Sequence, residues 1–290
     1  MNSLPAAHPL AVACSFLFVP GHQPSYLPKA LASGAHVVIV DWEDAVAPAH
    51  KADARAALAA AWPALAANER ARIAVRVNAV GTAWHPHDVQ ALAALAAQGL
   101  GAAVLPKAES AAALAPLAAA LGPQGVWLPL IESAAGLRAV HQVAAAPQVL
   151  RLLFGHLDFQ ADLGLACDED EAELSAVRLQ LVLASRLGGL AAPVDGVTPE
   201  VRDLALVQAH AARALRGGMG AKLCIHPAQV QAVHAAFAPS EAQQHWARRV
   251  QVALADAQGG VCTVDGRMVD APVRQLAAQV LQRAAHLAGT

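Results

Sequence analysis

The chain has 290 residues, of which 56% are hydrophobic, 14% are charged and 4% are aromatic. Its 20 basic and 22 acidic side chains leave a formal net charge of -2, which excludes the strongly basic surface that nucleic-acid binding requires. A chain of this length can bury a sizeable core, either as one large α/β barrel or as two smaller domains. We therefore expect its partner to be a small molecule and not a nucleic acid.

Several common sequence signals are absent. No apolar run reaches the ~18 residues that suggest a membrane span, and residues 1–13 lack the cationic start of a signal peptide. We therefore expect a cytoplasmic protein with no membrane partner. No GxGxxG, P-loop or GxSxG motif supports a nucleotide-binding or serine-hydrolase function. The four cysteines have no CxxC or zinc-like spacing, which predicts free thiols and no structural metal.

Apolar, β-branched runs bounded by Gly, Pro or charged residues predict eight strands. The runs cover residues 16–19, 36–40, 72–77, 102–105, 126–131, 151–154, 191–194 and 221–225. Alanine- and leucine-rich segments with helical spacing lie between them, at 51–66, 87–98, 109–120, 134–145, 170–187 and 200–215. This alternation indicates an α/β protein with a (β/α)8 TIM barrel, and a doubly wound open sheet is the alternative.

Residues 237–290 follow the eighth predicted strand. The pattern predicts a helix over 240–257, a hairpin with turns at Gly259-Gly260 and Asp265-Gly266, and a final helix over 272–287. We therefore expect a catalytic barrel domain over 1–236 and a C-terminal helical extension over 237–290. The extension is too small for a separate catalytic domain, so we expect a lid or an oligomerisation arm.

Polar residues follow each predicted strand at the point where it ends. They are Pro20-Gly21, Asp41-Trp42-Glu43-Asp44, Arg76-Val77-Asn78, Pro106-Lys107, Glu132-Ser133, Gly155 to Asp158, Asp195-Gly196 and His226-Pro227. Barrel enzymes build their active sites from the loops at the carboxyl-terminal ends of the strands. The pattern therefore predicts an active site at this end of the barrel.

Two of these carboxylates, Glu132 and Asp158, follow neighbouring predicted strands and should lie side by side. Two carboxylates with open positions for water and substrate are the usual way in which a protein holds Mg²⁺. The alternative is that both are helix-capping or ion-pair carboxylates, since Glu132 also begins the helix at Ser133. Spacing alone does not decide between these two roles.

Asp41, Glu43 and Asp44 form a dense acidic cluster after the second predicted strand. Their side chains could orient the water ligands of a metal without binding it directly. The alternative is that they cap the helix that begins near Pro48.

Arg76 is the only arginine among these strand ends. A buried guanidinium among carboxylates would clamp a substrate carboxylate or a developing enolate oxygen. The alternative is a structural Arg–Asp pair inside the barrel mouth. Lys107 follows a proline, where a Schiff-base lysine could stand, but its plainer role is to pair with the acidic cluster.

The sequence resembles the HpcH/HpaI aldolase and citrate lyase β-subunit family, nearer the citrate lyase branch. Eight pieces carry the resemblance and span residues 15–270 in the family's order. They are Ser15-Phe16-Leu17-Phe18-Val19-Pro20-Gly21, Asp41-Trp42-Glu43-Asp44-Ala45-Val46, Arg76-Val77-Asn78, Leu105-Pro106-Lys107, Ile131-Glu132-Ser133, Phe154-Gly155 through Asp162-Leu163-Gly164, Lys222-Leu223-Cys224-Ile225-His226-Pro227 and Asp265-Gly266-Arg267-Met268-Val269-Asp270.

The resemblance implies a (β/α)8 barrel that forms a homo-oligomer, a trimer or hexamer. It also implies a Mg²⁺-dependent lyase that cleaves or forms a carbon–carbon bond in a 3-hydroxyacyl thioester of CoA or of a carrier protein. Malyl-, citramalyl- and citryl-CoA are such thioesters, and the products are an α-keto acid and an acyl-CoA. The alternatives are a malyl-CoA thioesterase, a class II aldolase acting on free hydroxy-keto acids, and a non-catalytic binding protein.

Motif by motif, the resemblance implies roles for the strand-end residues. Glu132 and Asp158 would hold Mg²⁺, and Arg76 would polarise the keto or thioester oxygen. The carboxylate of the α-keto acid would bind to backbone N–H groups of four consecutive residues. These are Gly155, His156, Leu157 and Asp158.

The resemblance extends to residues outside these strand ends. Asp270 matches an aspartate that, in relatives, comes from the C-terminal arm of a neighbouring subunit and acts as the base. Lys29 matches a lysine that contacts the CoA phosphates in some relatives. One departure is that Cys14 stands where the family often has arginine, so either thioester-cofactor binding is weaker here or another residue replaces that cation.

Overall fold

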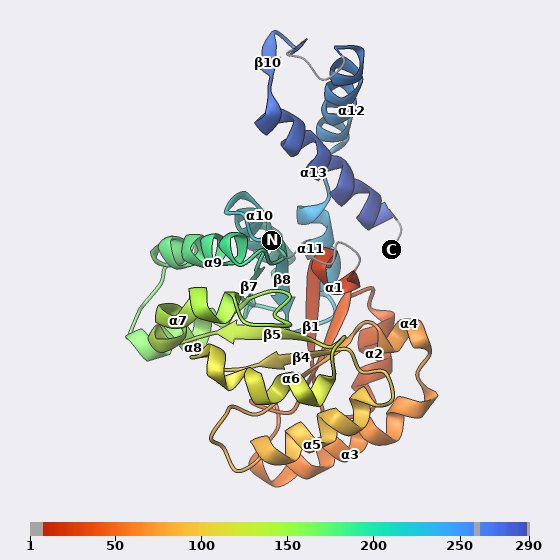
Figure 1. Ribbon diagram of the computed structural model, residues 1–290, viewed down its shortest axis with the longest axis vertical. Coiled ribbons are helices and arrows are strands. Elements are labelled where there is room, and N and C mark those ends of the chain that lie inside the picture. Colours follow the sequence, from red (N-terminus) through yellow and green to blue (C-terminus); the bar gives the residue numbers. More distant parts are fainter. Residues whose placement is uncertain (1–7, 258–261, 289–290) are drawn as a thin grey trace. The chain divides into compact units, whose positions relative to one another are not determined.

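Eight parallel strands close into a barrel, in sequence order, within the residues that the computed structural model describes, 8–257 and 262–288 (Figure 1). The first strand pairs with the eighth through Ser15 and Lys222, which closes the sheet. The strands are β1 (Ser15–Pro20), β2 (Val37–Asp41), β3 (Ile73–Arg76), β4 (Ala102–Leu105), β5 (Val126–Ile131), β6 (Leu153–Phe154), β7 (Val194–Asp195) and β8 (Ala221–Cys224). This closure confirms the predicted (β/α)8 barrel and excludes the open sheet.

Helices connect the strands and cover the outside of the barrel, where Figure 1 shows α3, α5 and α6 side by side. Val140, Val143 and Ala144 of α7 are buried, the i, i+3, i+4 pattern of a helix that packs one face on a sheet. The helices of this part are α1 (Pro9–Val12), α2 (Tyr26–Ala32), α3 (Lys51–Ala61), α4 (Ala67–Arg70), α5 (His85–Ala96), α6 (Ala115–Leu121), α7 (Ala134–Ala144), α8 (His156–Leu163), α9 (Ser175–Leu187), α10 (Leu204–Arg216) and α11 (Gln229–Phe237). None of the helices in the described ranges is both long enough and apolar enough to cross a membrane.

The barrel interior is a packed hydrophobic core. One cluster of buried side chains draws residues from all eight strands, with alternate residues of several of them, such as Val37 and Ile39 of β2 and Leu128 and Leu130 of β5. Alternate residues of a strand point to the same face, so these side chains converge inside the barrel. Because the interior is filled, a ligand site has to lie at an end of the barrel.

The structure differs from the sequence prediction at β7 and α8. The seventh strand is shorter than predicted because Pro193, directly before it, has no N–H to donate to a neighbouring strand. Residues 156–163, for which the sequence pattern predicted no helix, form α8. This eight-residue helix lies between Gly155 and Gly164, which adopts the left-handed conformation common after a helix end.

The chain divides into two compact units, Met1–Ala236 and Phe237–Thr290. In the second unit, α12 (Glu241–Asp256) packs against α13 (Ala271–Ala288), and β9 (Cys262–Val264) pairs with β10 (Arg267–Val269) in a hairpin. The hairpin turn predicted at Asp265-Gly266 is present, with both residues at positive φ. The turn predicted at Gly259-Gly260 lies outside the described residues. A role as lid or oligomerisation arm stays a prediction.

Candidate active site

A cavity of about 360 Å³ lies at the carboxyl ends of the barrel strands. Its lining includes the last residues of β2, β3 and β6, which are Asp41, Arg76 and Phe154. Glu132, which follows β5, and Asp158, in the first turn of α8, also line it. Side chains that are far apart in the sequence therefore meet in one volume, at the end of the barrel where the strand-end pattern predicts an active site.

Glu132 is buried at the edge of this cavity, and backbone geometry fixes its position. The N–H of Lys107 donates to Glu132 Oε1 over 2.7 Å. Lys107 adopts a φ of +46°, uncommon for a residue other than glycine. On the other side, a Cβ atom at Gly155 would lie 2.6 Å from Glu132 Oε2, so only glycine lets the backbone approach this carboxylate.

The cavity has more negative charge than its own cations offset. Burial raises the pKa of Glu132 to about 8, and the charges of Glu43 and Asp158 also raise it. The hydrogen bond from the backbone N–H of Lys107 and the charge of Arg76 oppose this rise. Burial likewise raises the pKa of Glu43 to about 7. These pKa values are raised because several carboxylates are crowded together with little positive charge nearby. Carboxylate oxygens in such an arrangement suit a hard divalent ion such as Mg²⁺, which would supply that positive charge. The residues present therefore fit a metal.

Asp158 and the backbone of α8 face the cavity together. Asp158 is exposed and lies in the first turn of the helix, which begins at His156. The first N–H groups of a helix have no partner within the helix and carry partial positive charge. The first turn, with its cap Gly155, also lines the cavity, so N–H groups that could bind an anion lie next to a carboxylate that could hold a metal.

Arg76 forms a two-pronged ion pair with Asp41. Its Nε and Nη2 donate to Asp41 Oδ1 and Oδ2 over 2.8 and 2.6 Å, and its Nη1 lies 3.0 Å from Glu43 Oε2 and 3.1 Å from Asp44 Oδ2. The Asp41 oxygens also accept the N–H groups of Glu43 and Ala45. Burial alone would lower the pKa of Arg76, but the three carboxylates outweigh burial and raise it. Arg76 is therefore a fixed cation in the cavity wall. The predicted role of the acidic cluster toward a metal's water ligands stays a prediction.

Three further residues singled out in the sequence are not among the residues that line the cavity. The side chain of Lys107 is exposed, unlike the desolvated lysine that a Schiff base requires. Lys29 lies on the exposed face of α2, with its Nζ 5.9 Å from the centre of the Tyr26 ring. Asp270 belongs to the C-terminal unit, is exposed, and accepts the N–H of Val273 at the start of α13.

Cys14 directly precedes β1 and does not line the cavity, which lies at the other end of that strand. Its Sγ lies 3.4 Å from His36 Nδ1, and ligand atoms of Cys14, His36 and His234 are all within 4.8 Å of one another. Sequence spacing cannot reveal this group because its members come from three distant segments. The N–H of Cys14 donates to His36 Nδ1, and burial raises the pKa of the Cys14 thiol to about 12, so this thiol holds its proton at neutral pH.

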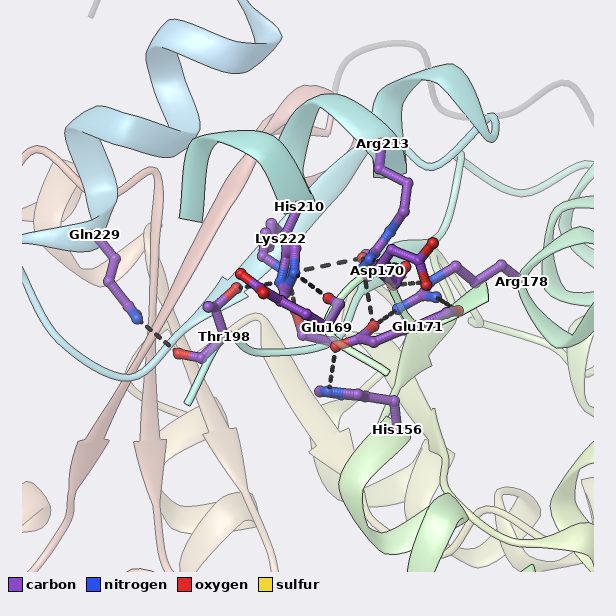
Figure 2. Close-up of polar contacts among 12 residues, drawn as sticks. His156, Glu169, Asp170, Glu171, Arg178, Thr198, His210, Arg213, Lys222 and Gln229 are labelled. Atoms are coloured by element: carbon purple, nitrogen blue, oxygen red, sulfur yellow. Dashed lines mark hydrogen bonds and ion pairs between the residues drawn. The ribbon is translucent and has the colours of Figure 1, made fainter. Parts of the chain in front are cut away.

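Sequence reasoning missed a buried polar network beside α8, which Figure 2 shows. His156 Nε2 lies 3.4 Å from Glu171 Oε1, and Glu171 Oε2 accepts from Arg178 and Arg213. Arg178 Nε also donates to Asp195 Oδ1 over 2.7 Å. Asp195 and His156 belonged to the predicted strand-end set, whereas Glu171, Arg178 and Arg213 did not. The only sequence signal for the rest is charge density within 168–178, which equally fits an exposed helix start.

Comparison with known proteins gives relatives that match over nearly the whole chain. A citrate lyase subunit beta-like protein of Mycobacterium tuberculosis is 36% identical over 280 residues, which cover 94% of this chain and 96% of the relative. A (3S)-malyl-CoA thioesterase of Cereibacter sphaeroides is 33% identical, covering 91% and 90%. An L-malyl-CoA/beta-methylmalyl-CoA lyase of the same species is 34% identical, covering 93% and 94%.

Solved structures give the same relationship. The protein CitE from Mycobacterium tuberculosis, solved with magnesium, acetoacetate and coenzyme A, superposes with a TM-score of 0.81 at 34% identity. The match covers 95% of this chain and 99% of that one. The family model for HpcH/HpaI aldolase/citrate lyase matches residues 14–227, which include all eight barrel strands in the described part of the chain. The chain belongs to the HpcH/HpaI aldolase/citrate lyase family.

Proposed function

We propose that this protein is a Mg²⁺-dependent carbon–carbon lyase acting on a 3-hydroxyacyl-CoA thioester such as malyl-, citramalyl- or citryl-CoA. It cleaves the thioester to an α-keto acid and an acyl-CoA, or forms it from them. The observation that carries the proposal is the convergence of the buried Glu132 and Arg76 with the exposed Asp158 on one cavity. The relatives that act on malyl-CoA, and the CitE structure that holds magnesium and coenzyme A, support it.

Glu132 and Asp158 would hold Mg²⁺, because they present carboxylate oxygens to the same cavity. When bound, the metal supplies the positive charge that makes a substrate hydroxyl easier to deprotonate. The same charge lets Glu132 ionise near neutral pH despite its burial.

The first turn of α8 would bind the carboxylate of the α-keto acid through the N–H groups of His156, Leu157 and Asp158, next to their cap Gly155. Arg76 would stabilise the enolate oxygen that develops when the carbon–carbon bond breaks. Asp41 holds this guanidinium by two hydrogen bonds, so the cation is already oriented before substrate binds.

Further roles follow from the family resemblance. Asp270, from the C-terminal unit of another subunit, would act as the base that takes the proton from the substrate hydroxyl. Lys29 would contact the CoA phosphates, and Asp41, Glu43 and Asp44 would orient water around the metal. We propose a cytoplasmic homo-oligomer, a trimer or hexamer, whose substrates are a small α-keto acid and an acyl-CoA.

A thioesterase is the second candidate, since one relative is named as a malyl-CoA thioesterase. The two activities give different products. With malyl-CoA and Mg²⁺, the lyase yields glyoxylate and acetyl-CoA and releases no thiol, whereas hydrolysis yields malate and free CoA thiol. We expect glyoxylate to appear while the thiol assay stays flat.

The same assay separates the remaining alternatives. Thiol release without glyoxylate makes the protein a thioesterase. Cleavage of free hydroxy-keto acids at an unchanged rate without CoA makes it an aldolase of the class II type. No turnover of malyl-, citramalyl- or citryl-CoA in either direction contradicts the lyase proposal and leaves a binding protein.

A further inference from the structure

His156 is the first residue of α8 and is among the residues that line the candidate-site cavity, yet its side chain is buried. The residue is 1% exposed. On one side, its Nε2 lies 3.4 Å from Glu171 Oε1, and Figure 2 shows the ring pointing toward that carboxylate. On the other side, a Cβ atom at Gly196 would lie 2.0 Å from His156 Nδ1, so the ring packs directly against the Gly196 backbone.

Glu171 is itself held in a strained conformation. It is a buried, non-glycine residue in the left-handed region, with φ 48° and ψ 41°. Its carboxylate accepts from Arg178, and from Arg213 Nη2 over 2.8 Å. Burial alone would raise the pKa of Glu171, but His156 and Arg178 outweigh burial and lower it, so the carboxylate is ionised.

We propose that Glu171 is a positioning residue for the candidate active site, which fixes the first turn of α8 by holding the His156 ring against Gly196. This proposal rests on the proposed function for the identity of the ligand. The eight-residue α8 is too short to be stable by itself, so its orientation depends on tertiary anchors such as His156. The same turn contains Asp158 and the N–H groups proposed to bind the keto acid. The contact between His156 and Glu171 would therefore fix the positions of both the proposed metal ligand and these N–H groups.

A first experiment measures, without any ligand, how strongly the His156–Glu171 contact stabilises α8. Hydrogen exchange is measured over Phe159–Leu163, whose amides close the turns of α8, in wild type, Glu171→Gln and His156→Ala. We expect faster exchange in both variants and no change in Glu173→Gln, an exposed glutamate two residues further along. His156→Ala leaves the arginine pairs of Glu171 intact, so it tests the anchor even if Glu171→Gln unfolds. Wild-type exchange in His156→Ala would overturn the proposal.

A second experiment measures ligand binding at the candidate site. Calorimetry with glyoxylate in the presence of Mg²⁺ should show roughly 10-fold weaker binding for either single variant, as for other residues that orient a metal site. Because Glu171 acts through His156, the double variant should bind no more weakly than His156→Ala alone. Losses that multiply in the double variant would mean that Glu171 acts by another route and would overturn the proposal.

A substitution at Gly196, which packs against the other side of the His156 ring, tests the proposal independently. Gly196→Ala should displace the His156 ring and weaken glyoxylate binding, whereas Gly101→Ala, where an added Cβ meets nothing within 4 Å, should not. If wild type binds no keto acid at all, the proposed function fails, and the exchange result alone then supports or overturns the anchor. If wild type binds glyoxylate and the His156 and Gly196 variants bind it equally well, the positioning role fails while the proposed function stands.

Discussion

The buried position of Glu132 disfavours the ionised form of its carboxyl group. In the unfolded chain its pKa is near the ordinary value of 4.5, whereas burial raises the folded value to about 8. Between these two values the folded state binds more protons than the unfolded state, so the free energy of unfolding falls as pH rises. Glu43, with its pKa raised by burial to about 7, contributes in the same direction.

We therefore expect that, in chelator, the contribution of Glu132 to the free energy of unfolding decreases from about pH 4.5 to pH 8. The slope from Glu132 is at most about 1.4 kcal/mol for each pH unit in this window. Urea unfolding at several pH values measures it, and Glu132→Gln should reduce the slope because the variant has no proton to lose. A variant with the wild-type slope would show that Glu132 does not titrate as proposed. Added Mg²⁺ should raise stability mainly at the upper end of the window.

Asp158 allows a metal-ligand test without a folding defect, because its side chain is exposed. Asp158→Ala should leave the free energy of unfolding within about 0.5 kcal/mol of wild type. Mg²⁺ affinity and Mg²⁺-dependent turnover should each fall by at least about 100-fold, since a direct ligand is lost. Asp168→Ala, an exposed aspartate outside the cavity lining, is the matched control. Unchanged turnover in Asp158→Ala would remove the metal proposal.

The sequence predicts those site residues whose position follows from where the barrel strands end. Glu132, Asp158 and Arg76 follow or end strands, and parallel strands of a barrel bring their carboxyl ends together. Glu171 was not predictable, because its partners come from other elements and their sequence spacing has no periodicity. The Arg76–Asp41 pair falls between these cases: its members were singled out, but only coordinates show that both Asp41 oxygens are engaged.

The junction of β6 and α8 is where element geometry and site chemistry meet. Gly155 ends the strand pairing and caps the helix, and its Cα lies against Glu132. Gly155→Ala would place a Cβ 2.6 Å from both the Cβ and Oε2 of Glu132, so the carboxylate or the start of α8 must move. We expect a loss of about 1–3 kcal/mol in stability and at least about 10-fold weaker Mg²⁺ binding, measured by urea unfolding and calorimetry.

Gly101→Ala serves as the control for Gly155→Ala, because open space surrounds that position. If Gly155→Ala binds Mg²⁺ like wild type, Glu132 can shift without cost and the close approach has no functional meaning.

The sequence did not predict α8 because eight residues between two glycines are too few for a helical period to emerge. Longer elements such as α7 and β5, whose apolar pattern repeats several times, were predicted to within a residue.

At the scale of the whole molecule, the barrel follows from sequence because strand and helix alternation constrains the topology strongly. Subunit assembly does not, because association depends on surface patches that carry no periodic signal. The two compact units have separate cores, the C-terminal one built on residues such as Val250, Val269 and Val280. A separate core suits an arm that acts on another subunit, which is the role proposed for the unit that carries Asp270.

Mixing two inactive variants tests that role. Glu132→Ala lacks the proposed metal ligand and Asp270→Asn lacks the proposed base, so each should be inactive alone. If the base comes from another subunit, a mixed oligomer contains sites with an intact barrel and an intact arm. Random 1:1 mixing in a closed ring should restore about a quarter of wild-type activity, the probability that both parts of a site are intact. Light scattering and tagged co-purification verify that the subunits have exchanged. Inactive mixtures despite exchange would place the base within its own subunit or elsewhere in the chain.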